Sequence, residues 1–194
     1  MYSRHDLCTT AGPELIEVTT IRKSDGFALI DLIFVVGIIG ILFGIAAPNL
    51  LQARQSSGAA SAIGSLRAIS SGQLTFALTC GGGFYAPALT VLGTAPAGSN
   101  EAFISPNMGA DDSVIRAGYL VEMEATPFAG APASCNGLAA GEAGQAFVAG
   151  ADPVEPNVTR FFGINANGMI WEDTASVYVT MPEIGDPANG HPLR

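Results

Sequence analysis

Charged residues are scarce in this chain of 194 residues, and basic residues are the scarcest of them. Only 13% of the residues are charged, and 17 acidic residues outnumber 8 basic ones. Residues 101–194 contain twelve of the acids and only three arginines, Arg116, Arg160 and Arg194. Because such an acidic surface repels phosphate backbones, we expect no nucleic acid to bind this part of the chain.

Residues that commonly perform catalysis or bind metals are also few. The chain has two histidines, His5 and His191, and neither is near a cysteine in sequence. There is no phosphate-binding loop, no dinucleotide fingerprint and no metal-ligand spacing. We therefore expect a protein that is not an enzyme and uses no cofactor or metal. Four loop acids could supply oxygen ligands for calcium, although solvated acids are the more frequent case: Asp111, Asp112, Glu183 and Asp186.

Charge is lowest between Phe27 and Ala47, where 21 residues include one charged side chain, Asp31. As a helix with a rise of about 1.5 Å per residue, this run crosses a hydrocarbon core of roughly 30 Å. It exceeds the apolar core of about 7–15 residues found in cleavable secretory signals. Pro48 follows it directly and would obstruct signal peptidase. The run is therefore predicted to be a transmembrane segment.

Asp31 needs its own explanation, because an acid inside an apolar helix costs roughly 2.5–3.5 kcal/mol on insertion scales. One interpretation is that Asp31, four residues into the run, reaches back to the lipid headgroups. The other is that its carboxylate is buried and waits for a cation. The residues before the run favour the second interpretation.

A basic pair, Arg22-Lys23, and a single glycine, Gly26, precede the apolar run. The sequence Gly26-Phe27-Ala28-Leu29-Ile30-Asp31, followed by the long apolar run and Pro48, resembles the class III signal of type IV prepilins and pseudopilins. The resemblance covers about residues 20–55 closely. The family usually has Glu where this chain has Asp31, and its leader is usually shorter than the 26 residues found here.

The resemblance implies a precise processing step. A membrane peptidase would cut after Gly26 on the cytoplasmic side and methylate the new amino group of Phe27. Asp31 would then form the assembly ion pair with the Phe27 amine of a neighbouring subunit. Arg22 and Lys23 stay cytoplasmic under the positive-inside rule, so the chain after Pro48 lies outside the cytoplasm.

The resemblance also implies a function. The chain would be a structural subunit of a type IV pilus, a surface filament of adhesion and motility, held in the inner membrane as a single-pass protein before assembly. Its partners would be further copies of itself in a homopolymeric filament, the prepilin peptidase, the inner-membrane assembly platform and, before assembly, the lipid bilayer. The alternative is a pseudopilin of a type II secretion or DNA-uptake system.

The fold expected is α+β, the pilin fold, in which a long N-terminal helix packs on a small antiparallel sheet. Residues 1–26 form the leader, 27–79 the helix and 80–194 a loop-rich head. Beyond a kink at Pro48, the helix becomes amphipathic, and glycines 81–83 end it. The stripe predicted to pack on the sheet consists of Ala59, Ile63, Leu66, Ile69, Leu74 and Ala77.

The head shows several strand signals. Residues 119–125 alternate in polarity, and residues 160–164 and 169–172 flank an Asn-Gly turn, which predicts a hairpin. A further strand is expected at 176–180, giving a sheet of three or four strands. Residues 84–112 are expected to form an extended surface loop that can include one short helical turn, and residues 128–150 a small, flexible loop.

The leader contains Cys8, so processing would leave Cys80 and Cys135 as the cysteines of the mature chain. Two cysteines in an exported domain suggest a disulfide, with two free buried thiols as the alternative. Closing a loop of about 56 residues would stabilise the head by around 4 kcal/mol in the chain-entropy model.

Overall fold

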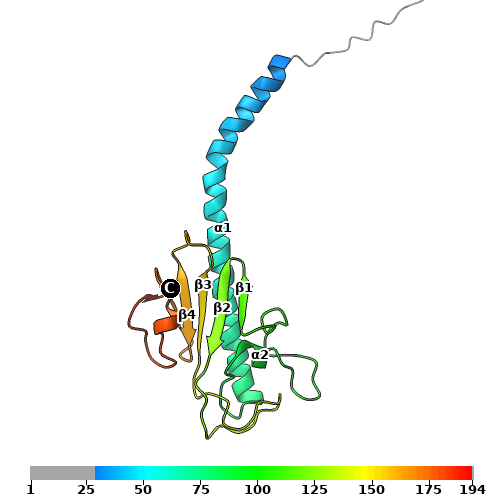
Figure 1. Ribbon diagram of the computed structural model, residues 1–194, viewed down its shortest axis with the longest axis vertical. Coiled ribbons are helices and arrows are strands. Elements are labelled where there is room, and N and C mark those ends of the chain that lie inside the picture. The colour runs from blue at the N-terminus through cyan, green and yellow to red at the C-terminus, as the bar shows by residue number, and fades with distance from the viewer. Residues whose placement is uncertain (1–28, 194) are drawn as a thin grey trace, which may run out of the picture. The chain divides into compact units, whose positions relative to one another are not determined.

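The computed structural model describes residues 29–193 and shows an α+β protein. The chain divides into two compact units, Met1–Ile45 and Ala46–Arg194. The division falls inside the long helix α1, which spans Leu29–Thr79 and runs through Pro48. The kink expected at Pro48 remains a prediction. The second unit contains all of the strands (Figure 1).

Helix α1 ends close to the predicted residue, and glycines make the stop possible. The N–H groups of Cys80 and Gly81 both donate to the carbonyl of Phe76, and that of Gly83 donates to Ala77. Gly82 and Gly83 have φ values of 61° and 95°. Because only glycine adopts this left-handed backbone without strain, the triple glycine ends the helix and satisfies its last carbonyls.

The buried side of α1 differs from the predicted stripe at one position. Ala59, Leu66, Ile69 and Ala77 are buried as expected and Ile63 is partly buried, but Leu74 is 55% exposed. The fully buried positions after Ile69 are Gln73 and Phe76. Leu74 lies about 100° around the helix from Gln73, which places it outside the contact face. The inclusion of Leu74 in the stripe was therefore wrong. The buried position belongs to Gln73, a polar residue, and not to its apolar neighbour Leu74.

The sheet is an antiparallel meander of six strands in chain order, and it is larger than predicted. The predicted strand at 119–125 and the hairpin around the Asn-Gly turn are confirmed by β2 and by the pairing of β4 with β5. The strands are β1 (Ser113–Arg116), β2 (Tyr119–Glu124), β3 (Val148–Pro153), β4 (Phe161–Asn165), β5 (Ile170–Asp173) and β6 (His191–Pro192).

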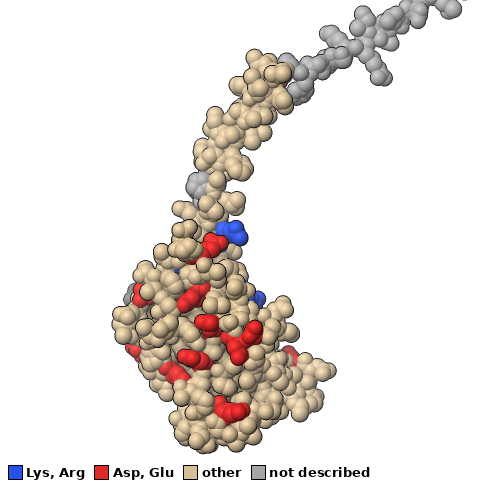
Figure 2. All heavy atoms as spheres, viewed as in Figure 1, with Lys and Arg blue, Asp and Glu red and all other residues tan. Residues whose placement is uncertain are grey.

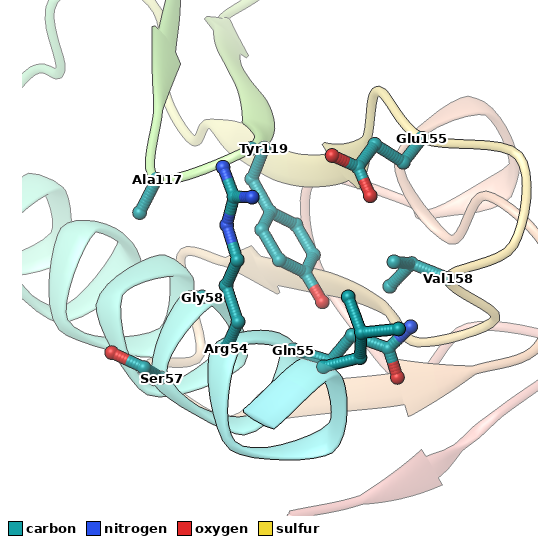
Figure 3. Close-up of a pocket in the computed structure, with 10 residues that line it drawn as sticks. Arg54, Gln55, Ser57, Gly58, Ala117, Tyr119, Glu155 and Val158 are labelled. Atoms are coloured by element: carbon teal, nitrogen blue, oxygen red, sulfur yellow. The ribbon is translucent and has the colours of Figure 1, made fainter. Parts of the chain in front are cut away.

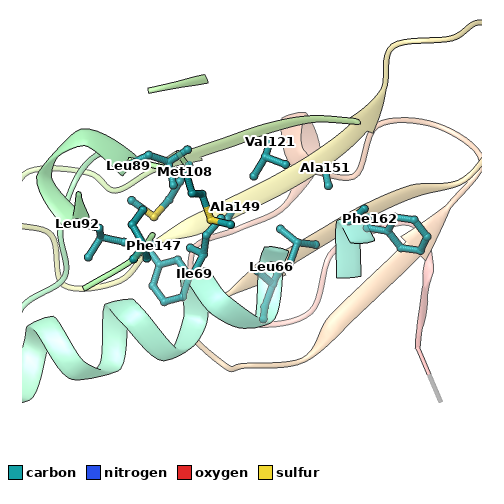
Figure 4. Close-up of a cluster of buried hydrophobic side chains, with 14 of the residues drawn as sticks. Leu66, Ile69, Leu89, Leu92, Met108, Val121, Phe147, Ala149, Ala151 and Phe162 are labelled. Carbon is teal, nitrogen blue, oxygen red and sulfur yellow. The ribbon is translucent and has the colours of Figure 1, made fainter. Parts of the chain in front are cut away.

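Strand β3 begins inside residues 128–150, which were expected to form a flexible loop, so that expectation was wrong for 148–150. Val148 to Gly150 are buried, and β3 pairs with β2 on one side and β4 on the other. Its small side chains carry little β propensity. They suit a central strand instead, since Ala149 and Ala151 lie in the core shared with α1 (Figure 4) and Gly150 leaves room for Tyr178 on the other face.

The strand expected at 176–180 was also wrong. Tyr178–Thr180 forms a short 3-10 helix, η1. Val177 and Met181, on either side of η1, pack with Val148 and Trp171 in a second apolar cluster. The segment covers the face of the sheet that α1 does not, and its apolar residues serve this contact instead of strand pairing.

Residues 84–112 contain the short helical turn that was expected, but they are not confined to the surface. They include a short helix, α2 (Leu89–Leu92), and both of its terminal leucines are fully buried. Ile104 and Met108 are buried in the same core. As Figure 4 shows, Leu89, Leu92 and Met108 meet Ile69 of α1 and Phe147 at one end of the sheet. The segment therefore closes the core that the sheet leaves open.

Candidate functional site

The first described turns of α1 present an apolar surface that no other part of the described chain covers. From Leu29 to Ile45 the large apolar side chains are between 44% and 77% exposed, and they occur on every side of the helix. A helix that is apolar all round normally lies in a protein core or in a membrane. Among the described residues, α1 is the one helix that is long and apolar enough to cross a membrane.

Asp31 is the charged residue of this surface. It lies in the first turn of α1, where a carboxylate is favoured by the positive end of the helix dipole. Its proposed partner, the Phe27 amino group, and the cleavage position at Gly26 lie outside the described residues. Both the processing step and the ion pair therefore remain predictions.

The disulfide between Cys80 and Cys135 is confirmed, with Cα atoms 4.9 Å apart. It joins the end of α1 to a loop 55 residues later. The same loop is held by hydrogen bonds: Cys135 N donates to Cys80 O at 3.3 Å, and Asn136 Nδ2 donates to Val91 O at 2.7 Å. The bridge and the Asn136 hydrogen bond together fasten three segments of the head.

Two buried amides hold other segments in place, and sequence reasoning missed both. Gln73 Nε2 donates to Ala86 O and Gln73 Oε1 accepts from Ala86 N, each at 2.8 Å. Asn165 Nδ2 donates to Pro182 O at 2.9 Å and to Gly185 O at 2.7 Å. Gln73 was missed because a polar residue of an amphipathic helix is expected on the exposed side. Asn165 stood in the predicted turn, where asparagine is expected for local reasons.

Acidic side chains spread over the visible face of the second unit, with few basic ones among them (Figure 2). The loop acids considered for calcium are not brought together, and the described residues contain no group of three acids, histidines or cysteines able to hold a metal. Asp112 Oδ1 accepts from Thr90 Oγ1 at 2.6 Å, and Glu183 Oε1 accepts from Thr126 N at 2.6 Å. These two acids therefore fasten loops.

One ion pair is found among residues 29–193. Arg160 Nε lies 2.5 Å from Glu172 Oε1, across the strand pair that the Asn-Gly turn connects. The Arg160 guanidinium also lies 5.2 Å from the centre of the Phe162 ring. The hydrogen bond from Arg160 holds the pKa of Glu172 below its ordinary value.

Comparison with known proteins gives no match: no family model fits the chain, and no curated protein or solved structure is similar to it.

Proposed function

We propose that this chain is a structural subunit of a type IV pilus, cut after Gly26 and polymerised through the N-terminal half of α1. The observation that carries the proposal is the junction itself. In the sequence, Gly26 and Phe27 are followed four residues later by a single acid, Asp31, in a helix whose apolar surface the described residues leave uncovered.

The uncovered apolar surface has to be shielded from water twice, before assembly and within the filament. Apolar side chains from Leu29 to Ile45 are costly in water, at roughly 25 cal/mol per Å². The lipid bilayer covers them first, and the same segments of neighbouring subunits cover them in the filament. Transfer from lipid to a helical bundle exchanges one apolar environment for another, so it needs little net energy and depends on close packing. Gly37, Gly40 and Gly44 have open space at their Cβ positions and allow neighbouring helices to approach closely.

The charge of Asp31 then selects the stagger between subunits. Cleavage creates an α-amino cation on Phe27, at the end of an apolar helix. In its own helix Asp31 lies about one turn away, whereas a neighbour shifted along the filament axis offers its amine directly to the carboxylate. In a low dielectric an unpaired charge is strongly disfavoured. Only the stagger that pairs both charges is therefore stable, and the apolar contacts supply the cohesion.

The second unit suits a position outside the cytoplasm. Disulfides persist in oxidising compartments, and the Cys80–Cys135 bridge joins segments of a head with many loops. Its net negative charge favours solubility over association with phosphate backbones. The head would form the outer surface of the filament.

Mass spectrometry of the mature chain tests the proposal. We expect an N-terminus at methylated Phe27 in the wild type and an uncut precursor in the Gly26→Val variant, since a branched side chain does not fit a pocket for glycine. A mature chain that retains residues 1–26 would contradict the proposal.

Imaging separates the filament types. A strain lacking the chain should lose surface filaments if the subunit builds a pilus. Loss of secretion or DNA uptake with surface filaments intact would show a pseudopilin instead.

A further inference from the structure

The dipeptide Asn-Gly occurs three times in the head, at 136–137, 167–168 and 189–190. In such a pair the glycine nitrogen can attack the asparagine side chain, because glycine has no Cβ to hinder the approach. All three pairs lie outside the strands, and their glycines have positive φ values of 99°, 78° and 92°. The local sequence is therefore equally suited to this reaction at each pair, and the tertiary structure decides which pair reacts.

Hydrogen bonds fix the side chain of Asn136. Its Nδ2 donates to the carbonyl oxygens of Val91 at 2.7 Å and Thr94 at 3.2 Å. Its Oδ1 accepts from the Ser134 hydroxyl. These bonds must break before the side-chain carbonyl carbon can turn towards the nitrogen of Gly137, and each of them slows the reaction by about fivefold. This pair should therefore react slowest.

The backbone holds the second pair. Gly168 N donates to Asn165 O at 2.9 Å, and Asn167 N donates to Asn165 Oδ1 at 3.1 Å. Asn165 is buried, and its own side chain donates to the carbonyl oxygens of Pro182 and Gly185. The attacking nitrogen of Gly168 is therefore engaged in the turn of the β4–β5 hairpin, and the attack requires this turn to open.

Packing can hold a turn as well, as the turn between β1 and β2 shows. There Ala117 lies beside α1 (Figure 3), and a Cβ at Gly58 of α1 would be only 2.9 Å from the Ala117 carbonyl oxygen. The turn before β6 is different. Apart from its chain neighbours, the heavy atoms nearest to the Cβ position of Gly190 belong to Glu172 and Asp173, at the end of β5. This glycine therefore faces the end of one strand and not a helix.

The Asn189–Gly190 pair is left open to reaction. Both residues are exposed, and neither forms a hydrogen bond to any residue in the described range. The Asn189 side chain can therefore rotate, and the Gly190 nitrogen can approach it, without the loss of a hydrogen bond. Because the reactive geometry is reached without this cost, the pair adopts it more often than the other two.

We propose that Asn189–Gly190 is a site of spontaneous deamidation, with water as the co-reactant. The Gly190 nitrogen attacks Cγ of Asn189 and forms a bond to it. The Cγ–Nδ2 bond breaks, and ammonia leaves with the proton that the Gly190 nitrogen gives up. Water then opens the cyclic imide. Opening at the main-chain carbonyl gives isoaspartate, in which the chain continues through Cγ, and opening at Cγ gives aspartate.

Isoaspartate at this position should loosen β6, the edge strand. β6 is two residues long, and its His191 pairs with Glu172 of β5. Isoaspartate adds a methylene to the main chain two residues before His191. It also adds a carboxylate next to Gly190, whose Cβ position lies 3.6 Å from the Cβ of Asp173. The longer chain and the repulsion between like charges both oppose this short pairing.

Peptide mapping of the purified full chain tests the proposal. The native chain is kept at mildly alkaline pH, where the glycine nitrogen loses its proton more readily. Reduction and trypsin then give peptides 117–160 and 161–194, and tandem mass spectrometry separates Asn167 from Asn189 within the second peptide. We expect deamidation at Asn189 to be about fivefold faster than at Asn167 and more than about tenfold faster than at Asn136.

The reduced chain in denaturant is the control. Without tertiary structure the three pairs should react at similar rates, since glycine follows asparagine in each. Asn189→Gln should abolish the reaction at 189, because glutamine would have to form a larger ring, and Asn167→Gln should leave it unchanged. Faster reaction at Asn136 or Asn167 in the native chain, or the same order of rates in denaturant, would overturn the proposal.

Hydrogen exchange measures the effect on β6. The isoaspartate form, separated by ion exchange, should exchange the amides of residues 170–173 faster than the unmodified chain. Asn189→Asp is the matched control, because it adds the charge without lengthening the main chain and should show a smaller increase. Equal exchange in all three would contradict the loosening of β6. These measurements use neither cleavage nor assembly, so an uncut Gly26–Phe27 bond would defeat the pilus proposal alone.

Discussion

The two halves of α1 differ in what covers their apolar side chains. Beyond residue 58, buried positions recur every three or four residues and face the sheet. From Leu29 to Ile45, apolar side chains surround the helix and no other described residue covers them. The same secondary structure therefore has a partner inside the fold in one half and needs an external partner in the other. Assembly and head stability should consequently respond to different mutations.

The largest effect should come from Asp31→Ala. We expect cleavage after Gly26 to proceed, because the cleavage residues are unchanged, while incorporation into filaments falls to background. The neighbour's amine then has no anion in a low dielectric. Quantitative electron microscopy of filaments and immunoblots of the processed chain provide the two measurements.

Asp31→Glu is the matched control, because it keeps the charge and should assemble at least as well as the wild type. The head should unfold at the same denaturant concentration in both variants. Normal filaments from Asp31→Ala would show that Asp31 is an acid at the headgroups without a role in assembly.

The next largest effect concerns the head. Cys135→Ser should lower its free energy of unfolding by about 2–5 kcal/mol, since the open loop regains conformational entropy in the unfolded state. Trp171 is the chain's single tryptophan and is 9% exposed, so its fluorescence reports unfolding. Native thiol titration that finds two reactive cysteines in the wild-type head would contradict this expectation.

A paired substitution sharpens the distinction between the faces of α1. Leu66→Ala should destabilise the head by roughly 2–5 kcal/mol because it leaves a cavity in the core. Leu74→Ala should cost about 0.5 kcal/mol or less, since Leu74 is 55% exposed whereas Leu66 is 0% exposed. Denaturant unfolding followed by Trp171 fluorescence measures both. Similar losses from the two variants would restore Leu74 to the contact face.

The smallest effect should come from the Arg160–Glu172 pair. The hydrogen bond from Arg160 lowers the pKa of Glu172, so the folded state favours the charged form of this carboxylate. The pair therefore contributes stability at pH values above the ordinary carboxyl pKa, and this contribution disappears as pH falls through the lower pKa of the folded state. Because Arg160 is 46% exposed, Arg160→Gln should cost only about 0.2–1 kcal/mol at pH 7. The loss should vanish in strong acid, and a pH-independent loss would point to packing on Phe162 instead.

Sequence reasoning succeeded where a local pattern repeats. The helix end at glycines 81–83, β2 and the β4–β5 hairpin each have a signal within a few residues. It failed at β3 and at 176–180. Val148–Pro153 has small residues without clear alternation, and Val177 has strand propensity but covers the sheet. Both outcomes depend on contacts with segments distant in sequence.

The candidate sites divide in the same way. The cleavage proposed at Gly26–Phe27 and the role proposed for Asp31 come from the sequence, because the residues of this signal are consecutive. The buried amides of Gln73 and Asn165 were not recognised, because their backbone partners lie on other segments.

By itself, the sequence determined that α1 has an apolar half and an amphipathic half, because helical periodicity and run length are properties of neighbouring residues. It also determined which cysteines were left to pair once a leader was assigned. The tertiary structure alone decided that Gln73 is buried and Leu74 is not, since the amide finds both of its backbone partners on Ala86. It also decided that a run of alanine and glycine becomes a central strand, because burial from both faces outweighs weak local propensity.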